Sequence, residues 1–274
     1  MKILITGNSG YIGSHLTKIL MNTGHEVYGL DIKPHTIKNY GQYQLDIKRN
    51  FELDQGFDVC IHLAALVNVS ESEKHPIDYY ITNLNGTMNV LSRVRCNHFI
   101  FSSTGAAEFC HSAYGVSKRA AEDIIKEYCS VHKKIPYTIF RFYNVIGTDG
   151  IEPTNPDGLF YKLIEAKTTG KFTIYGKDYS VSPDGTCVRD YVHVNEVCES
   201  INTALDKPSN SIECLGHGVG YTVKEIVNLF CKVNDCDFDI EYGPRRMGDL
   251  PSSVLENVSS YMKNMYSIEE LLKI

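Results

Sequence analysis

A tyrosine and a lysine in the middle of the chain have the spacing of an acid–base pair. Tyr114 and Lys118 lie in the segment Ser112-Ala-Tyr-Gly-Val-Ser-Lys118, and on a helix this spacing places both side chains on one face. A tyrosine acts as a base near neutral pH only if its pKa falls by about three units from its usual value of about 10. A nearby ammonium group favours the ionised phenolate and lowers that pKa. We therefore expect Tyr114 to be the base and Lys118 the cation that assists it.

Hydroxyl side chains precede this pair at the end of an apolar run. The segment His98-Phe-Ile-Phe-Ser-Ser-Thr104 predicts a strand over His98–Ser102 whose carboxyl end carries the hydroxyls. Thr104 is expected to hold a substrate hydroxyl and to help relay its proton. A Tyr-x-x-x-Lys pair alone is more often a surface feature, so the hydroxyl strand end and a cofactor site elsewhere are needed to make it catalytic.

A glycine-rich segment near the start of the chain predicts that cofactor site. Gly7, Gly10 and Gly13 lie between a predicted strand and a predicted helix, where glycines permit a tight turn and close approach to a pyrophosphate. Three glycines also fit an ordinary turn, but the next strand ends in Asp31, 24 residues after Gly7, near the place of a carboxylate that binds ribose hydroxyls. A carboxylate repels a 2′-phosphate, so NAD is favoured over NADP, although Lys33 weakens that preference.

Short β-branched runs alternate with amphipathic helical stretches in the first half of the chain. Strands are predicted at Lys2–Thr6, Glu26–Asp31, Tyr43–Asp46, Val59–Ala64, His98–Ser102 and Tyr137–Phe142, and helices at 11–22, 76–94 and 112–132. After residue 146 the pattern changes to helices at 158–168, 194–205 and 222–233 and strands at 172–175, 211–215 and 238–242. These patterns predict an α/β fold, a Rossmann-type doubly wound parallel sheet with a smaller mixed α/β C-terminal substrate-binding portion.

The predicted division places the NAD-binding Rossmann domain at residues 1–145. The substrate-binding portion follows at 146–274, and its segment from about 186 to 213 is expected to pack back on the Rossmann domain.

Length and composition exclude several other classes of protein. The chain has 274 residues, of which 43% are hydrophobic and 22% charged, which excludes overall disorder. Its net charge is −6 and no basic cluster is present, so nucleic acid is not expected as a partner. No apolar run is long enough for a membrane span, and a strand beginning at Lys2 leaves no room for a signal peptide, so a cytoplasmic location is expected. The nine cysteines contain no CxxC pair and are interpreted as reduced core thiols, without a metal site.

Several motifs resemble those of a known family. Thr6-Gly-x-x-Gly-x-x-Gly13, His62-Leu-Ala-Ala65, Asn83-Leu-Asn-Gly86 and the Tyr114/Lys118 pair resemble the extended short-chain dehydrogenase/reductases of the nucleotide-sugar type, in the NAD-dependent epimerase/dehydratase family. Three later motifs are similar to those of the UDP-glucose 4-epimerases: Tyr175-Gly-Lys-Asp-Tyr179, Asp184-Gly-Thr-Cys-Val-Arg-Asp-Tyr-Val-His-Val194 and Arg245-Arg-Met-Gly-Asp-Leu-Pro251. The similarity covers almost the whole chain.

The resemblance implies an activity and a set of site residues. The activity is reversible oxidation of UDP-hexoses at C4, through a 4-keto sugar that turns over before hydride returns, with Tyr114 as the base. The implied NAD contacts are Gly7, Gly10, Tyr11, Ile12, Gly13, Asp31, Asp46, Ile47, Leu63, Ala64, Ala65, Asn83, Ser102, Tyr114, Lys118 and Tyr143. The implied UDP-sugar contacts are Thr104, Tyr114, Asn144, Leu159, Tyr175, Arg189, Arg246, Asp249 and Ser253. Two arginines suit a diphosphate, and a tyrosine ring suits stacking on uracil.

The sequence departs from the family pattern at three places. Only ten positions separate Thr104 from Tyr114, fewer than is usual in the family, so the pocket wall there must be built differently or be open. Gly105 and Ala106 stand where the related dehydratases carry an acid pair, so dehydration is not expected, and Glu108 is interpreted as a surface or capping residue. Ser253 stands where the glucose-restricted members of the family tend to have a bulky tyrosine. Its small side chain leaves room for a 2-acetamido group and predicts that UDP-GlcNAc and UDP-GalNAc are also accepted.

Two other functions remain open from the sequence. One is a sugar-nucleotide dehydrogenase or reductase with net turnover of NAD(P)H, and the other is a catalytically idle NAD-sensing protein. The family pattern also implies a homodimer formed by the helices near 76–94 and 112–132. His193 is interpreted as a core residue that satisfies a hydrogen bond and has no catalytic role.

Overall fold

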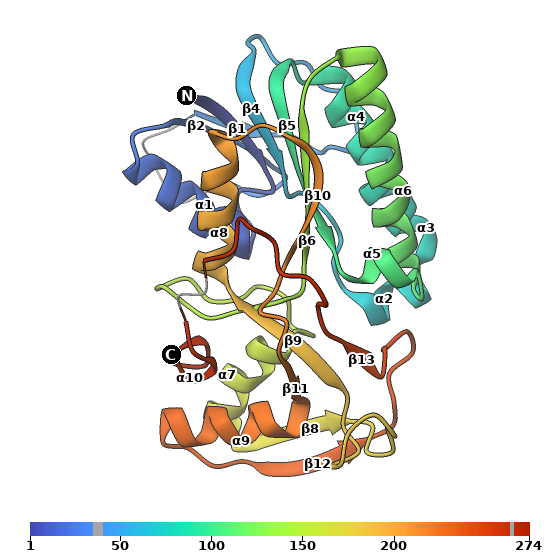
Figure 1. The fold of residues 1–274 in the computed structure, drawn as a ribbon, viewed down its shortest axis with the longest axis vertical. Coiled ribbons are helices and arrows are strands. Elements are labelled where there is room, and N and C mark those ends of the chain that lie inside the picture. Colours follow the sequence, from blue (N-terminus) through green and yellow to red (C-terminus); the bar gives the residue numbers. More distant parts are fainter. Residues whose placement is uncertain (35–40, 264–265) are drawn as a thin grey trace.

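The computed structural model describes residues 1–34, 41–263 and 266–274 (Figure 1). A sheet covered on both faces by helices forms the larger part of the molecule, and a smaller mixed portion lies below it in the view of Figure 1. Among the described residues, no helix is long and apolar enough to cross a membrane.

The larger part is built on a parallel sheet of seven strands, as the alternating pattern predicted. Its strands are β1 (Lys2–Thr6), β2 (Glu26–Asp31), β3 (Gly41–Gln44), β4 (Phe57–His62), β5 (Cys96–Thr104), β6 (Tyr137–Phe142) and β10 (Asn210–Leu215). Their order is β10-β6-β5-β4-β1-β2-β3, and every neighbouring pair is parallel. Because β10 comes from the second half of the chain and pairs with β6, the sheet is completed by a late segment.

Strands β3, β4 and β5 differ by two residues from the predicted bounds, and β3 lies two residues earlier, at Gly41–Gln44 rather than Tyr43–Asp46. Strand β4 begins at Phe57 and ends at His62, two residues earlier at each end than predicted. The chain leaves the sheet after His62 because Leu63 and Ala64 lie against the turn at Gly7, where a Cβ would approach the Ala64 nitrogen to 2.7 Å. Strand β5 is longer than predicted and extends to Thr104, which therefore stands at the edge of the sheet.

Helices cover the sheet on both faces (Figure 1). Helix α1 (Tyr11–Asn22) and helix α8 (Val194–Leu205) pack together on one face, where Leu16 and Val197 are fully buried. Helix α4 (Gly86–Arg93) and helix α6 (Ala113–Glu127) cover the other face. Each has apolar residues at the three- and four-residue spacing that turns one side of a helix to a core.

The two longest predicted helices are interrupted. The segment predicted as one helix over 76–94 consists of α3 (Pro76–Tyr79), a π-helical turn η1 (Tyr80–Asn85) and α4. The segment predicted over 112–132 is α6 followed by a second π-helical turn, η2 (Tyr128–Lys133), which ends at Lys134 with φ 54°. Single π-helical turns of this kind are frequent near functional sites.

The smaller portion has its own core and strands. Strands β8 (Lys171–Tyr175) and β12 (Asp239–Gly243) form a parallel pair, and β9 (Val188–His193) is joined by β7 (Asn144–Ile146), β11 (Gly220–Thr222) and β13 (Ser252–Ser253). The helices are α7 (Leu159–Thr169), α9 (Val223–Asn234) and the short α10 (Ile268–Leu271). Phe160, Phe230 and Phe238 pack in this core. Strand β9 was not recognised in the sequence, where its segment was considered only as a ligand motif.

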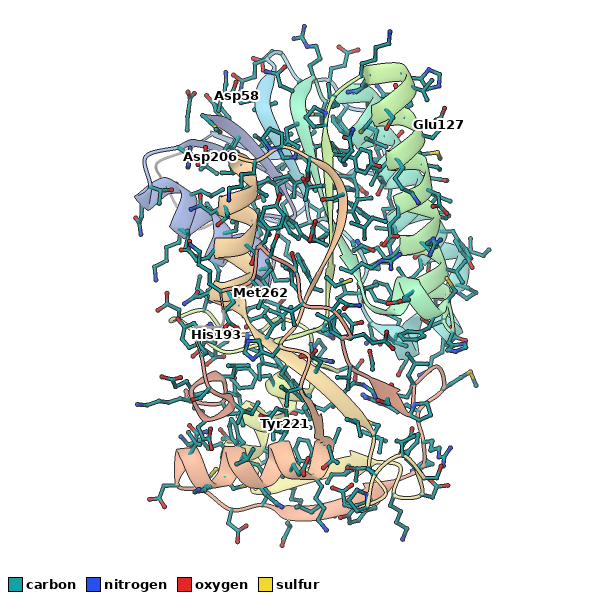
Figure 2. The ribbon with its side chains drawn as sticks, viewed as in Figure 1. Asp58, Glu127, His193, Asp206, Tyr221 and Met262 are labelled. Atoms are coloured by element: carbon teal, nitrogen blue, oxygen red, sulfur yellow. The ribbon has the colours of Figure 1, made fainter. Side chains whose placement is uncertain are left out.

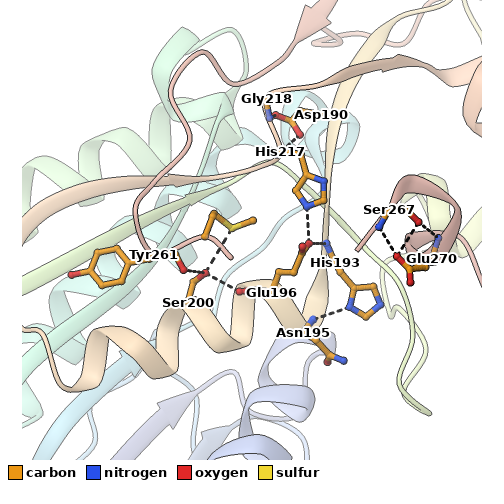
Figure 3. Close-up of polar contacts among 11 residues, drawn as sticks. Asp190, His193, Asn195, Glu196, Ser200, His217, Gly218, Tyr261, Ser267 and Glu270 are labelled. Carbon is orange, nitrogen blue, oxygen red and sulfur yellow. Dashed lines mark hydrogen bonds and ion pairs between the residues drawn. The ribbon is translucent and has the colours of Figure 1, made fainter. Parts of the chain in front are cut away.

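Buried polar contacts hold the junction between the two portions. The Asp190 carboxylate accepts hydrogen bonds from the backbone nitrogens of His217 and Gly218, and the buried Glu196 carboxylate pairs with the His217 ring at 2.8 Å (Figure 3). The backbone nitrogen of Leu255 also donates to Asp190. His193 lies at this junction, whereas Tyr221 lies in the smaller portion (Figure 2). Nδ1 of His193 accepts from the backbone nitrogen of Asn195, which is the structural contact expected for a core histidine.

The cysteines are distributed between core and surface. Cys60, Cys129, Cys187 and Cys198 are buried, as the prediction of core thiols required. Cys110 is exposed, because it lies with φ 53° at the end of α5 (Ala106–Phe109) rather than inside an element. The prediction is therefore wrong for Cys110.

Candidate active site

One cavity of about 1120 Å³ joins the carboxyl edge of the sheet to the smaller portion. In open α/β sheets, ligands bind at this edge, outside the carboxyl ends of the strands. Every residue that the sequence predicted for the cofactor or the substrate lines this cavity, except Asn83. The tertiary structure thus brings together residues from both halves of the chain.

Tyr114 and Lys118 reach the cavity from the first turns of α6. Ser112 caps this helix by accepting a hydrogen bond from the backbone nitrogen of Gly115 at 3.1 Å. Lys118 Nζ donates to the Ser102 carbonyl at 2.6 Å, and this contact fixes the lysine against the end of β5. The Thr104 side chain, also from β5, is hydrogen-bonded to the Tyr114 hydroxyl. The three residues predicted for catalysis therefore meet at one point of the cavity.

Burial controls the charge of this pair. It raises the pKa of Tyr114 to about 12, and the hydrogen bond from Thr104 opposes this increase. Burial also lowers the pKa of Lys118 to about 7, while the nearby Glu122 opposes that decrease. The lysine charge was expected to lower the tyrosine pKa, but in the chain alone desolvation of the phenol is the largest effect on this pKa and raises it. An additional positive charge beside Tyr114 is needed to make it a base at neutral pH.

The glycine-rich turn between β1 and α1 fits a dinucleotide pyrophosphate. Gly7 has φ 74°, and a Cβ at Gly13 would lie 2.2 Å from the Gly7 carbonyl oxygen. The first turn of α1 contains no acidic residue, and no side chain of the described residues caps its N-terminus at Gly10. Its backbone N–H groups are thus available to an anion.

The acid after β2 stands beside this turn. One oxygen of Asp31 accepts from the backbone nitrogen of Ser9 at 3.0 Å, and the other accepts from that of Lys33 at 2.9 Å. The carboxylate is held at the cavity wall, where a ribose diol can reach it. Asp46 and Ile47 line the wall nearby. These residues fit the adenosine half of NAD.

Asn83 lies behind the wall of the cavity. It is buried, its oxygen accepts from the backbone nitrogen of Leu66, and its amide nitrogen donates to the Leu66 carbonyl and to Ser117. The side chain therefore fixes the loop after β4 to α6. Its position favours support of the cofactor wall over direct contact.

The arginines and Tyr175 line the opposite end of the cavity. Asp249 lies between Arg189 and Arg246. Its Oδ1 is 3.9 Å from Nη2 of Arg189, and its Oδ2 is 3.0 Å from Nε of Arg246. The Arg246 guanidinium lies over the Tyr175 ring, 5.2 Å from its centre. Pairing with Asp249 orients both arginines, and their geometry suits a diphosphate. Ser253 is paired in register with Arg189, so it reaches the same end of the cavity.

The short segment between Thr104 and Tyr114 folds as a single helical turn, α5. It packs closely on α6, because a Cβ at Gly115 would lie 2.5 Å from the Ala106 carbonyl oxygen. Glu108 is exposed in this turn, as predicted, and His111 lines the cavity.

Tyr191 lines the cavity but was not singled out from the sequence. It is 2% exposed, and its hydroxyl has no hydrogen-bond partner among the described residues. Recognition of β9 as a strand would have found it, because residues two apart on a strand share one face and Arg189 had already been singled out.

Comparison with known proteins identifies the family. Residues 3–214 match the NAD dependent epimerase/dehydratase family. The chain belongs to this family. Its membership confirms the resemblance seen in the motifs, the Rossmann-type fold and NAD as the cofactor.

Relatives of this epimerase/dehydratase family member include enzymes of defined activity. The UDP-glucose 4-epimerase of Haemophilus influenzae is 32% identical, and the match covers 91% of this chain and 88% of the relative. The structure of the Thermotoga maritima UDP-glucose 4-epimerase with UDP-glucose has a TM-score of 0.86 at 28% identity, covering 100% of this chain and 96% of that one. The Campylobacter jejuni UDP-Glc/GlcNAc 4-epimerase has a TM-score of 0.78 at 28% identity, covering 99% and 97%.

Proposed function

We propose that this chain interconverts UDP-hexoses that differ in configuration at C4, such as UDP-glucose and UDP-galactose, with NAD as its bound cofactor. The observation that carries the proposal is the convergence of Tyr114, Lys118 and Thr104 in the cavity that also contains the glycine-rich turn and the two arginines. Family membership and the similarity to 4-epimerases support the same reaction.

Each catalytic residue has a defined task in this proposal. NAD, when bound, supplies a nicotinamide ring that accepts hydride from C4 of the sugar and returns it. Tyr114 removes the proton of the 4-hydroxyl as C4 becomes a ketone and gives the proton back when the ketone is reduced. Thr104 orients the sugar hydroxyl through its hydrogen bond with Tyr114. Lys118, held by the Ser102 carbonyl, stabilises the phenolate when its amine is protonated.

The nucleotide end of the substrate is assigned to the arginine pair. Arg189 and Arg246 bind the diphosphate, Tyr175 stacks on uracil, and Asn144 and Leu159 complete the wall. Binding at this end holds the nucleotide while the 4-keto sugar turns to present its other face. Inversion at C4 requires that the cavity leave space for this rotation.

The substrate range is proposed to include the N-acetylated sugars. Ser253 is a small side chain at the cavity wall, and a hydroxymethyl group leaves room for a 2-acetamido substituent that a tyrosine would fill. The similarity to an enzyme described as a UDP-Glc/GlcNAc 4-epimerase supports this range.

Other chemistries fit the site less well. A dehydratase needs an acid after Thr104, and the chain has Gly105 and Ala106 there, with Glu108 exposed. An idle NAD-sensing protein has no need of a buried Tyr114/Lys118 pair, which costs desolvation of both groups. A dehydrogenase or reductase with net NAD(P)H turnover is the remaining alternative.

One assay separates these functions. We expect the purified protein to convert UDP-galactose to UDP-glucose without added cofactor, as measured by anomeric NMR. Stoichiometric formation of NADH absorbance with UDP-galactose and added NAD would instead show a dehydrogenase, and absence of any conversion would overturn the proposal.

The oligomeric state and location are also proposals. We infer a homodimer through the helices at 76–93 and 113–127, because Ile77, Ile81, Met88 and Val116 are exposed on them. No partner other than the UDP-sugar and a second copy is proposed, so neither nucleic acid nor a membrane is included. The cytoplasmic location expected from the sequence stays a prediction.

A further inference from the structure

A buried carboxylate lies one helical turn beyond the lysine of the site. Glu122 on α6 is fully buried and does not line the cavity. Both of its oxygens are bound: Arg141 Nε donates to one at 2.9 Å and Arg141 Nη2 to the other at 2.8 Å, while the Ser103 hydroxyl donates to the first. The carboxylate is therefore held by β6 and by the end of β5.

A contribution to the stability of the fold does not by itself explain why Glu122 and Arg141 form a buried ion pair. Removing two charges from water costs free energy that their attraction often fails to recover, so apolar residues of similar volume are frequently as stabilising. The position of the pair is more informative. Tyr114, Lys118 and Glu122 follow one another at four-residue spacing, so they lie along one face of α6, and that face is turned to β5.

The surroundings of Lys118 contain few groups that could balance its charge. Tyr114 is an uncharged phenol, and His62 on β4 is neutral because burial and Lys118 lower its pKa to about 3. Glu122 is the charged group that raises the pKa of the lysine against the effect of burial. The groups that face Arg141 on its other sides are Glu108 of α5 and Cys214 of β10.

We propose that Glu122 is a positioning residue that favours the protonated form of the Lys118 amine beside the cofactor, and that Arg141 and Ser103 hold the Glu122 carboxylate in place for this purpose. The lysine then carries the positive charge that stabilises the Tyr114 phenolate. This inference rests on the proposed function, because it assigns a role within the same acid–base step. Glu122 acts only through Lys118, since it does not reach the cavity.

Direct titration of Lys118 tests the proposal without any measurement of turnover. The protein is labelled with [¹³Cε]lysine, and the Lys118 signal is assigned by its loss in Lys118→Arg. We expect Glu122→Gln to lower the titration midpoint of Lys118 by at least about one pH unit, and Glu122→Asp to restore part of the shift. Glu127→Gln, at an exposed site on the same helix, is the matched control and should leave the midpoint unchanged.

A double variant keeps the test decisive if the single variant does not fold. Glu122→Gln with Arg141→Met removes both charges of the buried pair, which is often tolerated. The Lys118 midpoint should fall here too, because Glu122 is the charged group that raises it against burial. An unchanged midpoint in a folded variant would overturn the proposal, and so would loss of the fold in both variants, since the pair would then be structural.

Turnover provides the second readout. In Glu122→Gln, the acid limb of the kcat/KM–pH profile should move to higher pH, with a loss of about tenfold near pH 7 for each unit. KM for UDP-galactose should change little, and Glu122→Asp should recover the profile in part. If the wild-type protein converts no UDP-sugar, the proposed function fails, whereas the Lys118 titration still decides the role of Glu122.

Discussion

Tyr114 is buried in a wall that raises the pKa of its hydroxyl to about 12, so the chain alone keeps the phenol protonated at neutral pH. Lys118 does not fully offset this, because burial lowers its own pKa to about 7 and leaves the amine only partly protonated at neutral pH. At the scale of single residues, the chain alone thus brings the catalytic side chains together but does not supply an ionised base. A cation that enters the cavity beside Tyr114 shifts the phenol toward its ionised form.

Replacement of Tyr114 by phenylalanine tests its role as the base. Tyr114→Phe removes the group that accepts the 4-hydroxyl proton, so conversion of UDP-galactose should fall at least about 100-fold, the lower end of what a positioned acid–base group contributes. Bound NAD, measured by release on denaturation, should be unchanged. Tyr242→Phe, at a side chain 42% exposed on β12, is the control and should keep full activity. Full activity in Tyr114→Phe would disprove the assignment.

Ser253 determines the substrate range in the proposed function. Ser253→Tyr places a ring at the end of the cavity beside Arg189, which should remove activity on UDP-GlcNAc and UDP-GalNAc while UDP-glucose and UDP-galactose are still converted. The ratio of turnover on the two pairs is the measurement. Ser252→Tyr, at the exposed neighbouring position, is the matched control. Equal loss of activity on both pairs in Ser253→Tyr would show that Ser253 does not determine the substrate range.

At the scale of elements, the contact of α5 with α6 decides how the shortened segment holds Tyr114. Gly115→Ala brings a Cβ to 2.5 Å from the Ala106 carbonyl oxygen, so α5 must move. Overpacking of this kind costs about 1–3 kcal/mol, which should appear as a lower midpoint of urea unfolding, together with lower kcat. Gly56→Ala, where the nearest atom is 3.6 Å away, should change neither quantity. Wild-type stability and kcat in Gly115→Ala would show that α5 is free to shift.

The apolar helix face gives a second prediction at this scale. Ile77 is 64% exposed on α3, and it belongs to the group of exposed apolar side chains that we assign to the dimer interface. Ile77→Asp should therefore convert a dimer into a monomer, measured by sedimentation velocity. Val181→Asp, on a different exposed apolar side chain, should leave the dimer intact. A monomeric wild-type protein would contradict the proposed interface.

At the scale of the whole molecule, buried histidines make the fold sensitive to acid. Burial lowers the pKa of His62 to about 3 and of His98 and His193 to about 4, below the unfolded value of about 6.5. Below about pH 6.5 the unfolded chain therefore binds more protons than the folded chain. The contribution of these histidines to the free energy of unfolding is complete above about pH 6.5 and is lost as the pH falls toward 4. His217 acts in the opposite direction, because Glu196 raises its pKa and its contribution is lost as the pH rises.

Burial also lowers the pKa values of His15 and His25, so the lowered histidines outnumber His217 and the free energy of unfolding should decrease between pH 7 and pH 5. Urea unfolding at several pH values measures this decrease. His98→Gln should reduce the pH dependence, because it removes one of the groups that takes up a proton on unfolding. A free energy that rises toward pH 5 would show that His217 dominates.

Much of the fold could be predicted because it follows from local patterns. The apolar runs of β1, β2 and β6 and the period of α1 and α8 locate these elements to within a residue. Strand β9 was missed because its polar residues serve the cavity and the junction, which hides its period. The π-helical turns were missed because their apolar spacing is nearly that of an α-helix.

The sequence by itself determined which residue types could do chemistry and in what order: the glycines, Asp31, the Tyr114/Lys118 pair and the arginines, all of which line the cavity. Only the tertiary structure decided how far each is from water and what faces it. In the folded chain Asn83 lies behind the cavity wall, and burial raises the pKa of Tyr114. Tyr191 lines the cavity with a hydroxyl that has no hydrogen-bond partner among the described residues. Glu122, paired with Arg141, lies one helical turn beyond Lys118. Residue type and spacing are local properties, whereas desolvation and pairing depend on contacts between distant segments, which exist only once the chain is folded.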